Sequence, residues 1–436
     1  MRQQSGDRTG IGGDLVTAFV SGGDSRLRID AVSGLNKYFC PIAPRPDIVC
    51  ASSCTASPIS QGGFDAAAGV FADVSDASSV RARELLLREH ARGIEQSLLR
   101  YFGADGLADA ILCPSGTDAM LLTIRLLAAE RPNVPMTAIL PSASETGTGV
   151  PMAAAGRLFD GPCQGQVTTS IEINAVEIAL RTTDGVPVPS DELDAAYAIA
   201  ESRVRGRAVV CLTYGTKTGL IAPRSPPASA DVIVDACQAR IDPARVAEYL
   251  RQGWPVIVSG SKFIGGPPFS GAVLFPVARR RCLRRQAPGI GTVLRWTAAL
   301  GSMQRFAPVS PRAGAFLEQR VAAIGRVIAA NPMLVPVSGL SSPGGHWADR
   351  PSIVTFAVRD PERRDSLLPA NALRPIYEGL ARGGVLLGQP VDLGRFGGLR
   401  IAIGARDVIE GLPAGRDRLL DAISALGRAE VGLAAE

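Results

Sequence analysis

The stretch that decides the fold is PVIVSGSKFIGGPP, residues 255–268. It opens with an apolar run of the kind that forms a strand buried on both faces, and the run ends in SGSK, with Lys262 last. The chain holds 46 basic residues, and only Lys37, Lys217 and Lys262 among them are lysines. A lysine at the end of a buried strand, in a chain that scarcely uses lysine, is predicted to carry chemistry rather than surface charge.

Similar apolar runs lie on both sides of this segment, and helical patterns separate them. We expect strands at 110–114, 137–141, 170–178, 208–214, 231–236 and 271–276, and helices at 79–102, from 117, from 190 and at 243–251. Buried strands that alternate with helices predict an α/β fold, a mostly parallel sheet sandwiched by helices.

The sequence changes character near residue 310. A long helix at 313–330 is followed by strands at 352–358, 384–388 and 399–404, a helix at 371–382 and a last helix to about 428, which predicts a smaller α+β domain over 309–436. The large domain is expected over 79–308. Residues 1–78 form an N-terminal extension, with a flexible, Gly-rich lead-in of about thirty residues that should carry little chemistry, and an extended segment at 40–60 of the kind that lines a site.

Composition excludes several classes of protein. Of 436 residues, 46% are hydrophobic and 20% charged, and no apolar run reaches the roughly 18 residues of a membrane span, so we expect a globular, cytoplasmic protein. The eight cysteines form no Cys-x-x-Cys, and only two histidines occur, which disfavours a metal site. The net charge of +5 comes from 46 basic and 41 acidic residues without basic runs, which argues against a nucleic-acid partner.

Two further motifs lie at predicted strand ends. Ser115-Gly116-Thr117 stands at a strand-to-helix turn, where free backbone N–H groups suit an anion such as phosphate, although the same residues are also typical of an ordinary helix cap. Asp235 and Gln238 follow the apolar strand that begins at 231. With Lys262, they describe a pocket for a phosphorylated pyridine aldehyde: an anion cradle, an acid for the ring nitrogen and an amine for the aldehyde.

The order and spacing of these motifs resemble those of the fold-type I pyridoxal-5′-phosphate enzymes, in the class V aminotransferase and cysteine desulfurase branch, over roughly residues 80–410. The resemblance implies pyridoxal 5′-phosphate as cofactor and a role for each matching residue. The cofactor phosphate would be bound by Ser115, Gly116, Thr117, Ser259 and Ser261.

The other roles follow from the same resemblance. Asp235 would pair with the pyridinium nitrogen, Gln238 would hydrogen-bond the phenolic oxygen, and Lys262 would form the internal aldimine. The segment GLRIAIG, residues 398–404, resembles the family's substrate strand, so Arg400 would bind the α-carboxylate of an amino acid substrate.

The segment GIGT, residues 289–292, resembles a loop that reaches across a dimer interface to the partner's cofactor phosphate. This resemblance implies a homodimer with composite sites, in which Thr292 contacts the cofactor. The alternative is that the segment is an ordinary Gly-rich loop. The strand end SETGTG, residues 144–149, lacks the aromatic residue that stacks on the ring in desulfurases. Glu145 or Thr146 is expected near the cofactor's face instead, unless these residues form a solvated turn.

The resemblance implies an enzyme that acts on an amino acid, class V aminotransferase-like. The alternative is a lyase, a decarboxylase or an enzyme that forms carbon–carbon or carbon–sulfur bonds. Desulfurase activity by the usual route is disfavoured because no cysteine follows Cys282, and a nucleotide-dependent oxidoreductase is disfavoured because no G-x-G-x-x-G follows a first strand. A cofactor-free relative that acts as a binding module is a further alternative.

A few residues have more than one reading. Lys217 is either a second acid/base or a solvated loop lysine, and Cys50 and Cys54 are either reactive thiols or small buried residues. Both His90 and His346 are expected to be structural.

Overall fold

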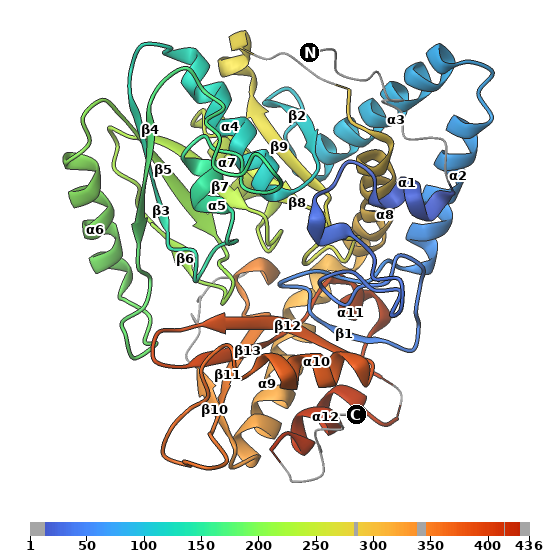
Figure 1. Cartoon of the computed structure of the whole chain (residues 1–436), viewed down its shortest axis with the longest axis vertical. Coiled ribbons are helices and arrows are strands. Elements are labelled where there is room, and N and C mark those ends of the chain that lie inside the picture. Colours follow the sequence, from blue (N-terminus) through green and yellow to red (C-terminus); the bar gives the residue numbers. More distant parts are fainter. Residues whose placement is uncertain (1–13, 283–286, 338–345, 414, 428–436) are drawn as a thin grey trace.

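The computed structural model describes residues 14–282, 287–337, 346–413 and 415–427, which form two β-sheets surrounded by helices (Figure 1). The larger sheet occupies the upper part of the view and the smaller sheet the lower part. Among the described residues, no helix combines the length and the apolar character needed to cross a membrane.

The large sheet is α/β in type, as predicted. Its strand order is β2-β9-β8-β7-β5-β3-β4, with the short β6 paired to β5, and β8, β7, β5, β3 and β4 are parallel neighbours. Strand β9 runs antiparallel to both of its neighbours, β2 and β8. The strands are β2 (Ala108–Cys113), β3 (Met136–Pro141), β4 (Ile173–Ile178), β5 (Arg207–Tyr214), β6 (Ile221–Ala222), β7 (Asp231–Ala236), β8 (Val256–Ser259) and β9 (Gly271–Pro276).

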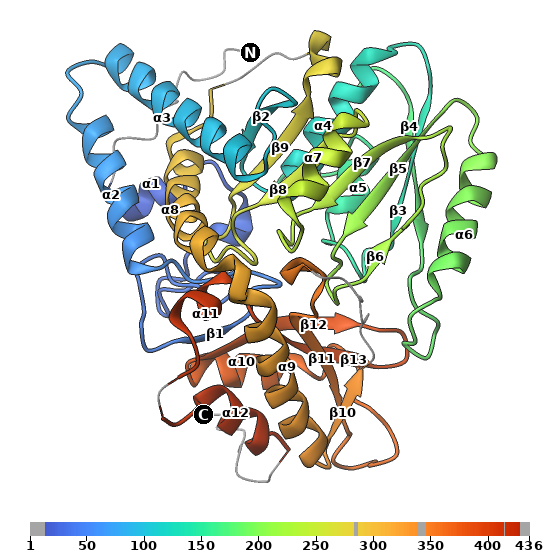
Figure 2. The same ribbon diagram turned by 180° about the vertical axis from the view of Figure 1, so that it is seen from behind.

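Alternation along the strands explains why helices cover both faces of this sheet. Ile257 and Val273 pack with the helices on one face, whereas Val256 and Val258 pack with those on the other. The first face carries α4 (Gly116–Glu130) and α5 (Val150–Ala154), and the second carries α3 (Val80–Tyr101), α7 (Pro243–Arg251) and α8 (Ile290–Phe306). Helix α6 (Ser190–Ser202) packs beside β3 and β4, as Figure 2 shows from behind.

The C-terminal part of the chain builds the smaller sheet together with β1 (Val49–Ala51) from the N-terminal segment, in the order β1-β12-β13-β11-β10. Its elements are α9 (Ala313–Ala330), β10 (Leu334–Val337), β11 (Ile353–Val358), α10 (Arg374–Arg382), β12 (Val385–Asp392), β13 (Gly397–Ala402), α11 (Ala405–Glu410) and α12 (Arg418–Ala425). The smaller α+β unit predicted from the sequence is thus confirmed. The last helix ends before the predicted limit at 428, which lies outside the described residues.

The N-terminal segment is more structured than predicted. Residues 1–13 lie outside the described part, but α1 (Leu15–Val20) packs on α8 and buries Ala18 and Phe19, so the expectation of a flexible lead-in is wrong for this stretch. Farther on, β1 (Val49–Ala51) adds a parallel strand to β12, and α2 (Gln61–Ser75) packs against α8. The apolar residues of α1 are few and flanked by glycines, which hides their helical spacing in the sequence.

Candidate active site

A cavity of about 300 Å³ lies at the edge of the large sheet, where the parallel strands end. Ligands bind at this edge in open α/β sheets. The lining comes from the start of α4, from the loops after β3, β5, β7 and β8, from the N-terminal segment and from β12 and β13. Of the site residues expected from the sequence, those that line the cavity are Ser115, Gly116, Thr117, Asp235, Ser259, Ser261, Lys262 and Arg400.

The start of α4 forms one wall of the cavity. Ser115 is the N-cap: its Oγ accepts the backbone N–H of Asp118 at 3.2 Å and lies 2.5 Å from that residue's Oδ2. The helix leaves backbone N–H groups of its first turn without intrahelical partners, and its dipole favours an anion there. A Cβ added at Gly116 would lie 2.4 Å from Sγ of Cys237, so the turn packs too closely for a side chain. The capping role and the anion cradle therefore coexist at this turn.

The serines after β8 face the same region because of the strand register. Ser259 lies opposite Gly271 of β9, and Gly271 lies opposite Cys113, just before the α4 turn. The hydroxyls of Ser259 and Ser261 are 2.6 Å apart and both line the cavity. The neutral donors expected for a phosphate are thus brought together from two strand ends.

An acid and an amine face this cavity without a partner of opposite charge. Asp235 is 8% exposed, and its Oδ1 accepts the backbone N–H of Cys237 at 3.0 Å. Within the described ranges, no ion pair involves Asp235, and no hydrogen bond or ion pair involves Nζ of Lys262. Both groups are therefore available to a ligand in the cavity.

Arg400 is a buried cation that forms no ion pair with a carboxylate in the part of the chain that the structure describes. It is 2% exposed, and it donates to the carbonyl of Gln389 from Nε (3.0 Å) and Nη2 (2.7 Å), to Oγ1 of Thr55 from Nη2 (3.0 Å), and to the carbonyl of Lys217 from Nη1 (2.9 Å). All these acceptors are uncharged. A buried guanidinium with only neutral partners is a strong receptor for a carboxylate, because burial without a counter-charge is costly.

Lys217 lines the cavity next to Arg400. Its Nζ donates to the carbonyl of Ala143 at 2.7 Å. Burial, and then the positive charge of Arg400, lower the pKa of Lys217 to about 8. It is a half-buried lysine, which excludes the reading as a solvated loop residue.

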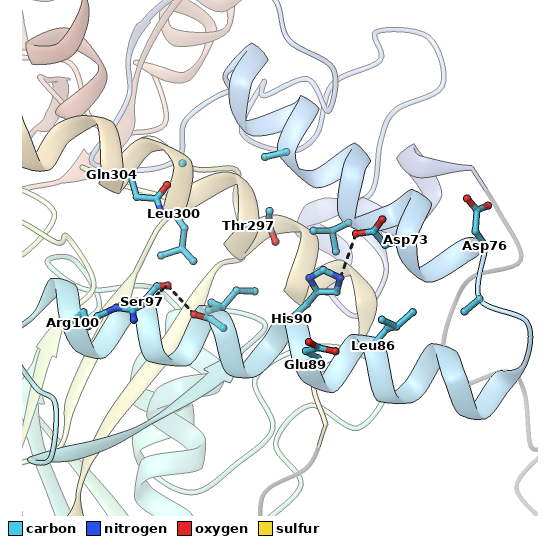
Figure 3. A pocket seen from close by; sticks show the side chains of 16 residues that line it. Asp73, Asp76, Leu86, Glu89, His90, Ser97, Arg100, Thr297, Leu300 and Gln304 are labelled. Carbon is cyan, nitrogen blue, oxygen red and sulfur yellow. Dashed lines mark hydrogen bonds and ion pairs between the residues drawn. The ribbon is translucent and has the colours of Figure 1, made fainter.

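A larger groove, of about 900 Å³, lies elsewhere, between α2, α3 and α8 (Figure 3). His90 lines this groove, and its Nε2 lies 3.8 Å from Oδ2 of Asp73. The groove is formed by helix surfaces and contains none of the residues at the strand ends, so the smaller cavity is the candidate active site.

Comparisons with known proteins bear on the fold. No protein-family model matches the chain, and no curated protein matches it significantly. Solved structures do match. The cysteine desulfurase CsdA from Escherichia coli has a TM-score of 0.56 at 14% identity, over 87% of this chain and 93% of that one. A structure of SPT with PLP internal aldimine has a TM-score of 0.54 at 16% identity, over 91% of this chain and 92% of that one.

A third match is the glutamate decarboxylase domain of a diaminobutyrate-pyruvate transaminase and L-2,4-diaminobutyrate decarboxylase from Vibrio parahaemolyticus. Its TM-score is 0.56 at 14% identity, over 87% of this chain and 80% of that one. This chain has the fold of the fold-type I pyridoxal-phosphate enzymes. That part of the resemblance seen in the sequence is confirmed.

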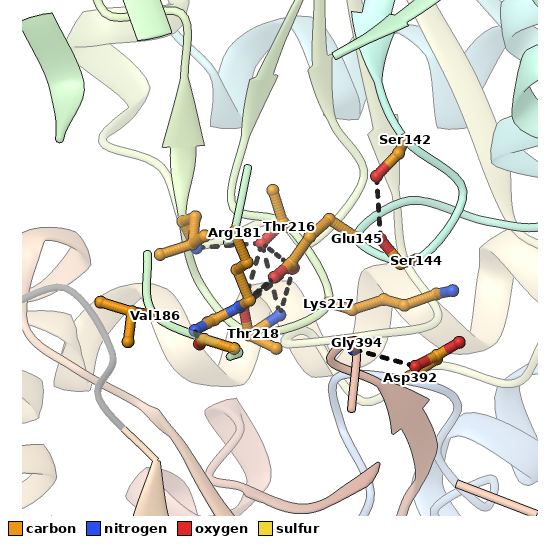
Figure 4. A network of polar contacts seen from close by, with 12 residues as sticks. Ser142, Ser144, Glu145, Arg181, Val186, Thr216, Lys217, Thr218, Asp392 and Gly394 are labelled. Atoms are coloured by element: carbon orange, nitrogen blue, oxygen red, sulfur yellow. Dashed lines mark hydrogen bonds and ion pairs between the residues drawn. The ribbon is translucent and has the colours of Figure 1, made fainter. Parts of the chain in front are cut away.

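Glu145 does not line the cavity, although the sequence placed it near the cofactor's face. It is buried outside the cavity lining, where its carboxylate accepts Nε of Arg181 (2.7 Å) and the hydroxyls of Thr216 (2.6 Å) and Thr218 (2.8 Å), as Figure 4 shows. Gly147 and Thr148 line the cavity from this loop instead. The sequence could not reveal that Arg181, from a segment after β4, draws the carboxylate away.

Gln238 also has other partners than expected. Its Nε2 donates to the carbonyl of Cys54 at 3.0 Å, and its Oε1 accepts Nη1 of Arg240 at 2.7 Å. Both ends of the amide are thus engaged, and Gln238 is not among the residues that line the cavity. Its neighbour Cys237 lines the cavity instead.

The segment at 289–292, which was expected to be a loop, is instead the start of a helix. Gly289 is the N-cap of α8, and Thr292, 3% exposed, lies in the first turn of that helix rather than in a loop. A Cβ added at Gly291 would lie 2.2 Å from the carbonyl oxygen of Ser21, because the N-terminal segment covers this turn. The turn is buried within its own chain, and the contact of Thr292 with a partner's cofactor in a homodimer stays a prediction.

The sequence missed a group of cavity residues from the N-terminal segment, namely Arg26, Lys37 and Tyr38. Arg26 pairs with Asp24 at 2.5 Å, and its guanidinium lies 4.8 Å from the ring centroid of Phe269. Burial alone would lower the pKa of Arg26, but the bond to Asp24 raises it. The rarity of lysine was the available signal, because all three lysines of the chain line this one cavity.

The remaining candidates divide between the cavity and the rest of the molecule. Cys54 lines the cavity, as the extended segment at 40–60 was expected to do, whereas Cys50 does not, and burial raises the pKa of its thiol. His346 caps a 3₁₀ turn, where its Nδ1 accepts the N–H of Ala348 at 3.2 Å.

Proposed function

We propose that this protein is a pyridoxal-5′-phosphate-dependent enzyme that acts on an amino acid, in the manner of the class V aminotransferases. The observation that carries the proposal is the unpaired amine of Lys262 in one cavity with Asp235 and the start of α4. The fold that the chain shares with pyridoxal-phosphate enzymes supports the same conclusion.

The cavity fits this cofactor in each of its parts. The hydroxyls of Ser115, Thr117, Ser259 and Ser261 and the first-turn amides of α4 would bind the phosphate. Asp235 would hold the ring nitrogen protonated, since no cation pairs with its carboxylate within the described ranges. Lys262 would bind the aldehyde carbon through its amine. When bound, the cofactor supplies an electron sink for the pair left at the substrate's α-carbon.

The chain's own residues then act on the amino acid. Arg400 would bind the α-carboxylate, which supplies the counter-charge that this buried guanidinium lacks. The amine of Lys262 would take or deliver the proton at the α-carbon. By holding the α-carboxylate, Arg400 would fix the orientation of the bonds at the α-carbon and so help to select the bond that breaks.

A second candidate function is a lyase or decarboxylase, or an enzyme that forms carbon–carbon or carbon–sulfur bonds. The observation that favours it is the loop after β3, which presents Gly147 and Thr148 to the cavity and no aromatic side chain. Incubation with a panel of amino acids separates the candidates: a transaminase yields a keto acid and the pyridoxamine form, whereas a decarboxylase yields carbon dioxide.

The proposal is tested by spectroscopy and by covalent trapping. Once unbound cofactor has been removed, protein that was mixed with pyridoxal phosphate should keep an absorption band near the visible range. Borohydride should fix the cofactor on Lys262, as located by peptide mass spectrometry. Lys262→Ala should lose the adduct. A wild-type protein that neither absorbs nor yields the adduct would refute the proposal.

A further inference from the structure

The cavity contains more positive charge than the proposed function uses. Its lining includes five cationic side chains, those of Arg26, Arg400 and the three lysines, but one carboxylate, that of Asp235. Arg26 has its own partner in Asp24, and the proposed function employs Lys262 and Arg400. Lys37 is exposed and therefore solvated. Lys217, half-buried, is the cation that remains without an assigned task.

The backbone holds Lys217 firmly in place. Its N–H donates to the carbonyl of Glu145 at 2.8 Å, and its own carbonyl accepts Arg400 at 2.9 Å. The residues on either side, Thr216 and Thr218, donate their hydroxyls to the Glu145 carboxylate. Figure 4 shows the side chain of Lys217 extending away from this network. The buried carboxylate of Glu145 therefore fixes the loop that presents Lys217 to the cavity.

The ammonium of Lys217 has unused capacity for an anion. One of its three N–H donors is engaged by the carbonyl of Ala143, and no ion pair of the described residues includes it. The charged groups that act on it are the cations Arg400 and Lys262 and the acids Glu145 and Asp392. Glu145 is already paired with Arg181. A half-buried ammonium beside two other cations gains most from an anionic ligand.

We propose that the amino acid substrate carries an anionic group on its side chain, which Lys217 binds while Arg400 binds the α-carboxylate. The hydrogen bond from the Arg400 guanidinium to the Lys217 carbonyl sets these two residues side by side in the lining of the cavity. This inference rests on the proposed function, and it makes Lys217 a specificity-determining residue. A monoanionic amino acid would leave the Lys217 ammonium without a counter-charge.

The experiment measures binding of unreactive acids to the cofactor-loaded protein by calorimetry at pH 7. Dicarboxylates (malonate, succinate and glutarate) are compared with monocarboxylates of equal length (propionate, butyrate and valerate). We expect at least one dicarboxylate to bind about tenfold or more tightly than its match, as a charge-assisted contact would give. Lys217→Met and Lys217→Gln should each bring that ratio to near one, and Lys217→Arg should keep a preference.

The control is Arg245→Gln, which removes a cation from the exposed face of α7 and should leave the ratio unchanged. Each Lys217 variant is also checked for the borohydride adduct on Lys262, which shows that the site is assembled. Equal binding of both acid classes to wild-type protein that forms the adduct, or a preference that survives Lys217→Met, overturns this inference alone. Absence of the adduct from wild-type protein overturns the proposed function instead.

Discussion

Replacement of Glu145 by Gln tests whether this carboxylate holds the structure together or faces the cofactor. In the structure, its side chain is 2% exposed and pairs with Arg181, whose side chain is 6% exposed. Gln has the same shape but no charge. Its amide nitrogen is a hydrogen-bond donor and would face the donors of Thr216, Thr218 and Arg181. Arg181 would keep bonds to Thr218 and to the carbonyl of Gly185, both at 2.8 Å, but no counter-charge from residue 145.

The magnitude follows from the buried ion pair. Loss of one partner of such a pair costs about 3–5 kcal/mol, and we take the lower end, about 3 kcal/mol, because Gln keeps one acceptor oxygen. For a domain of this size, about 1 kcal/mol corresponds to roughly 2–4 °C in the melting temperature. Calorimetry should therefore show Glu145→Gln melting about 6–12 °C below wild type. The adduct on Lys262 should still form, because Glu145 does not line the cavity.

Two controls sharpen this experiment. Glu172→Gln removes an exposed carboxylate and should leave the melting temperature nearly unchanged. The double variant of Glu145→Gln with Arg181→Met should lose less than the sum of the single losses, because no buried charge is left alone. A Glu145→Gln protein that melts like wild type but no longer forms the adduct would refute the structural role and restore the prediction made from the sequence.

Two further predictions concern the cavity itself. Gly116→Ala should weaken pyridoxal-phosphate binding about tenfold or more, measured by equilibrium titration, because its Cβ would lie 2.4 Å from Sγ of Cys237. The control Gly93→Ala, whose Cβ would meet nothing within 4 Å, should leave this binding unchanged. The preference for dicarboxylates should be full below pH 7 and fall about tenfold by pH 9. Lys217, whose pKa is lowered to about 8, loses its ammonium proton as the pH rises through this range. A preference that is the same from pH 7 to 9 would contradict this assignment.

The fold was largely predictable because its strands are buried on both faces. Such strands are uninterrupted apolar runs, so β7 and β8 could be located from the sequence pattern alone. Helices with clear apolar spacing were equally accessible, and α9 spans the predicted residues 313–330. The start of α8 was misread because a Gly-Ile-Gly segment is typical of a loop, whereas here Gly291 allows the N-terminal segment to pack against the helix.

The site was predictable only where a residue's position follows from its own strand. Asp235 and Lys262 each lie at the end of an apolar run, and parallel strands bring such ends to one edge of a sheet. Glu145 and Gln238 are also close to strand ends, but Arg181 and Arg240 hold their polar atoms. These contacts join segments that sequence order does not relate, so no local pattern indicated them.

The division of labour between arginine and lysine follows from their chemistry. The buried structural cations of this chain are arginines: Arg240 joins Ser53 to the carbonyl of Ile403, and Arg295 donates to the carbonyl of Phe269. Arginine suits these positions because its planar fork binds several acceptors and hardly ever loses its proton. A compact amine that can be neutral or charged near neutral pH is available from lysine alone. All three lysines lie in the lining of one cavity, and this placement supports the proposals that Lys262 acts as the reactive amine and that Lys217, whose loop is fixed by a buried carboxylate, binds an anion.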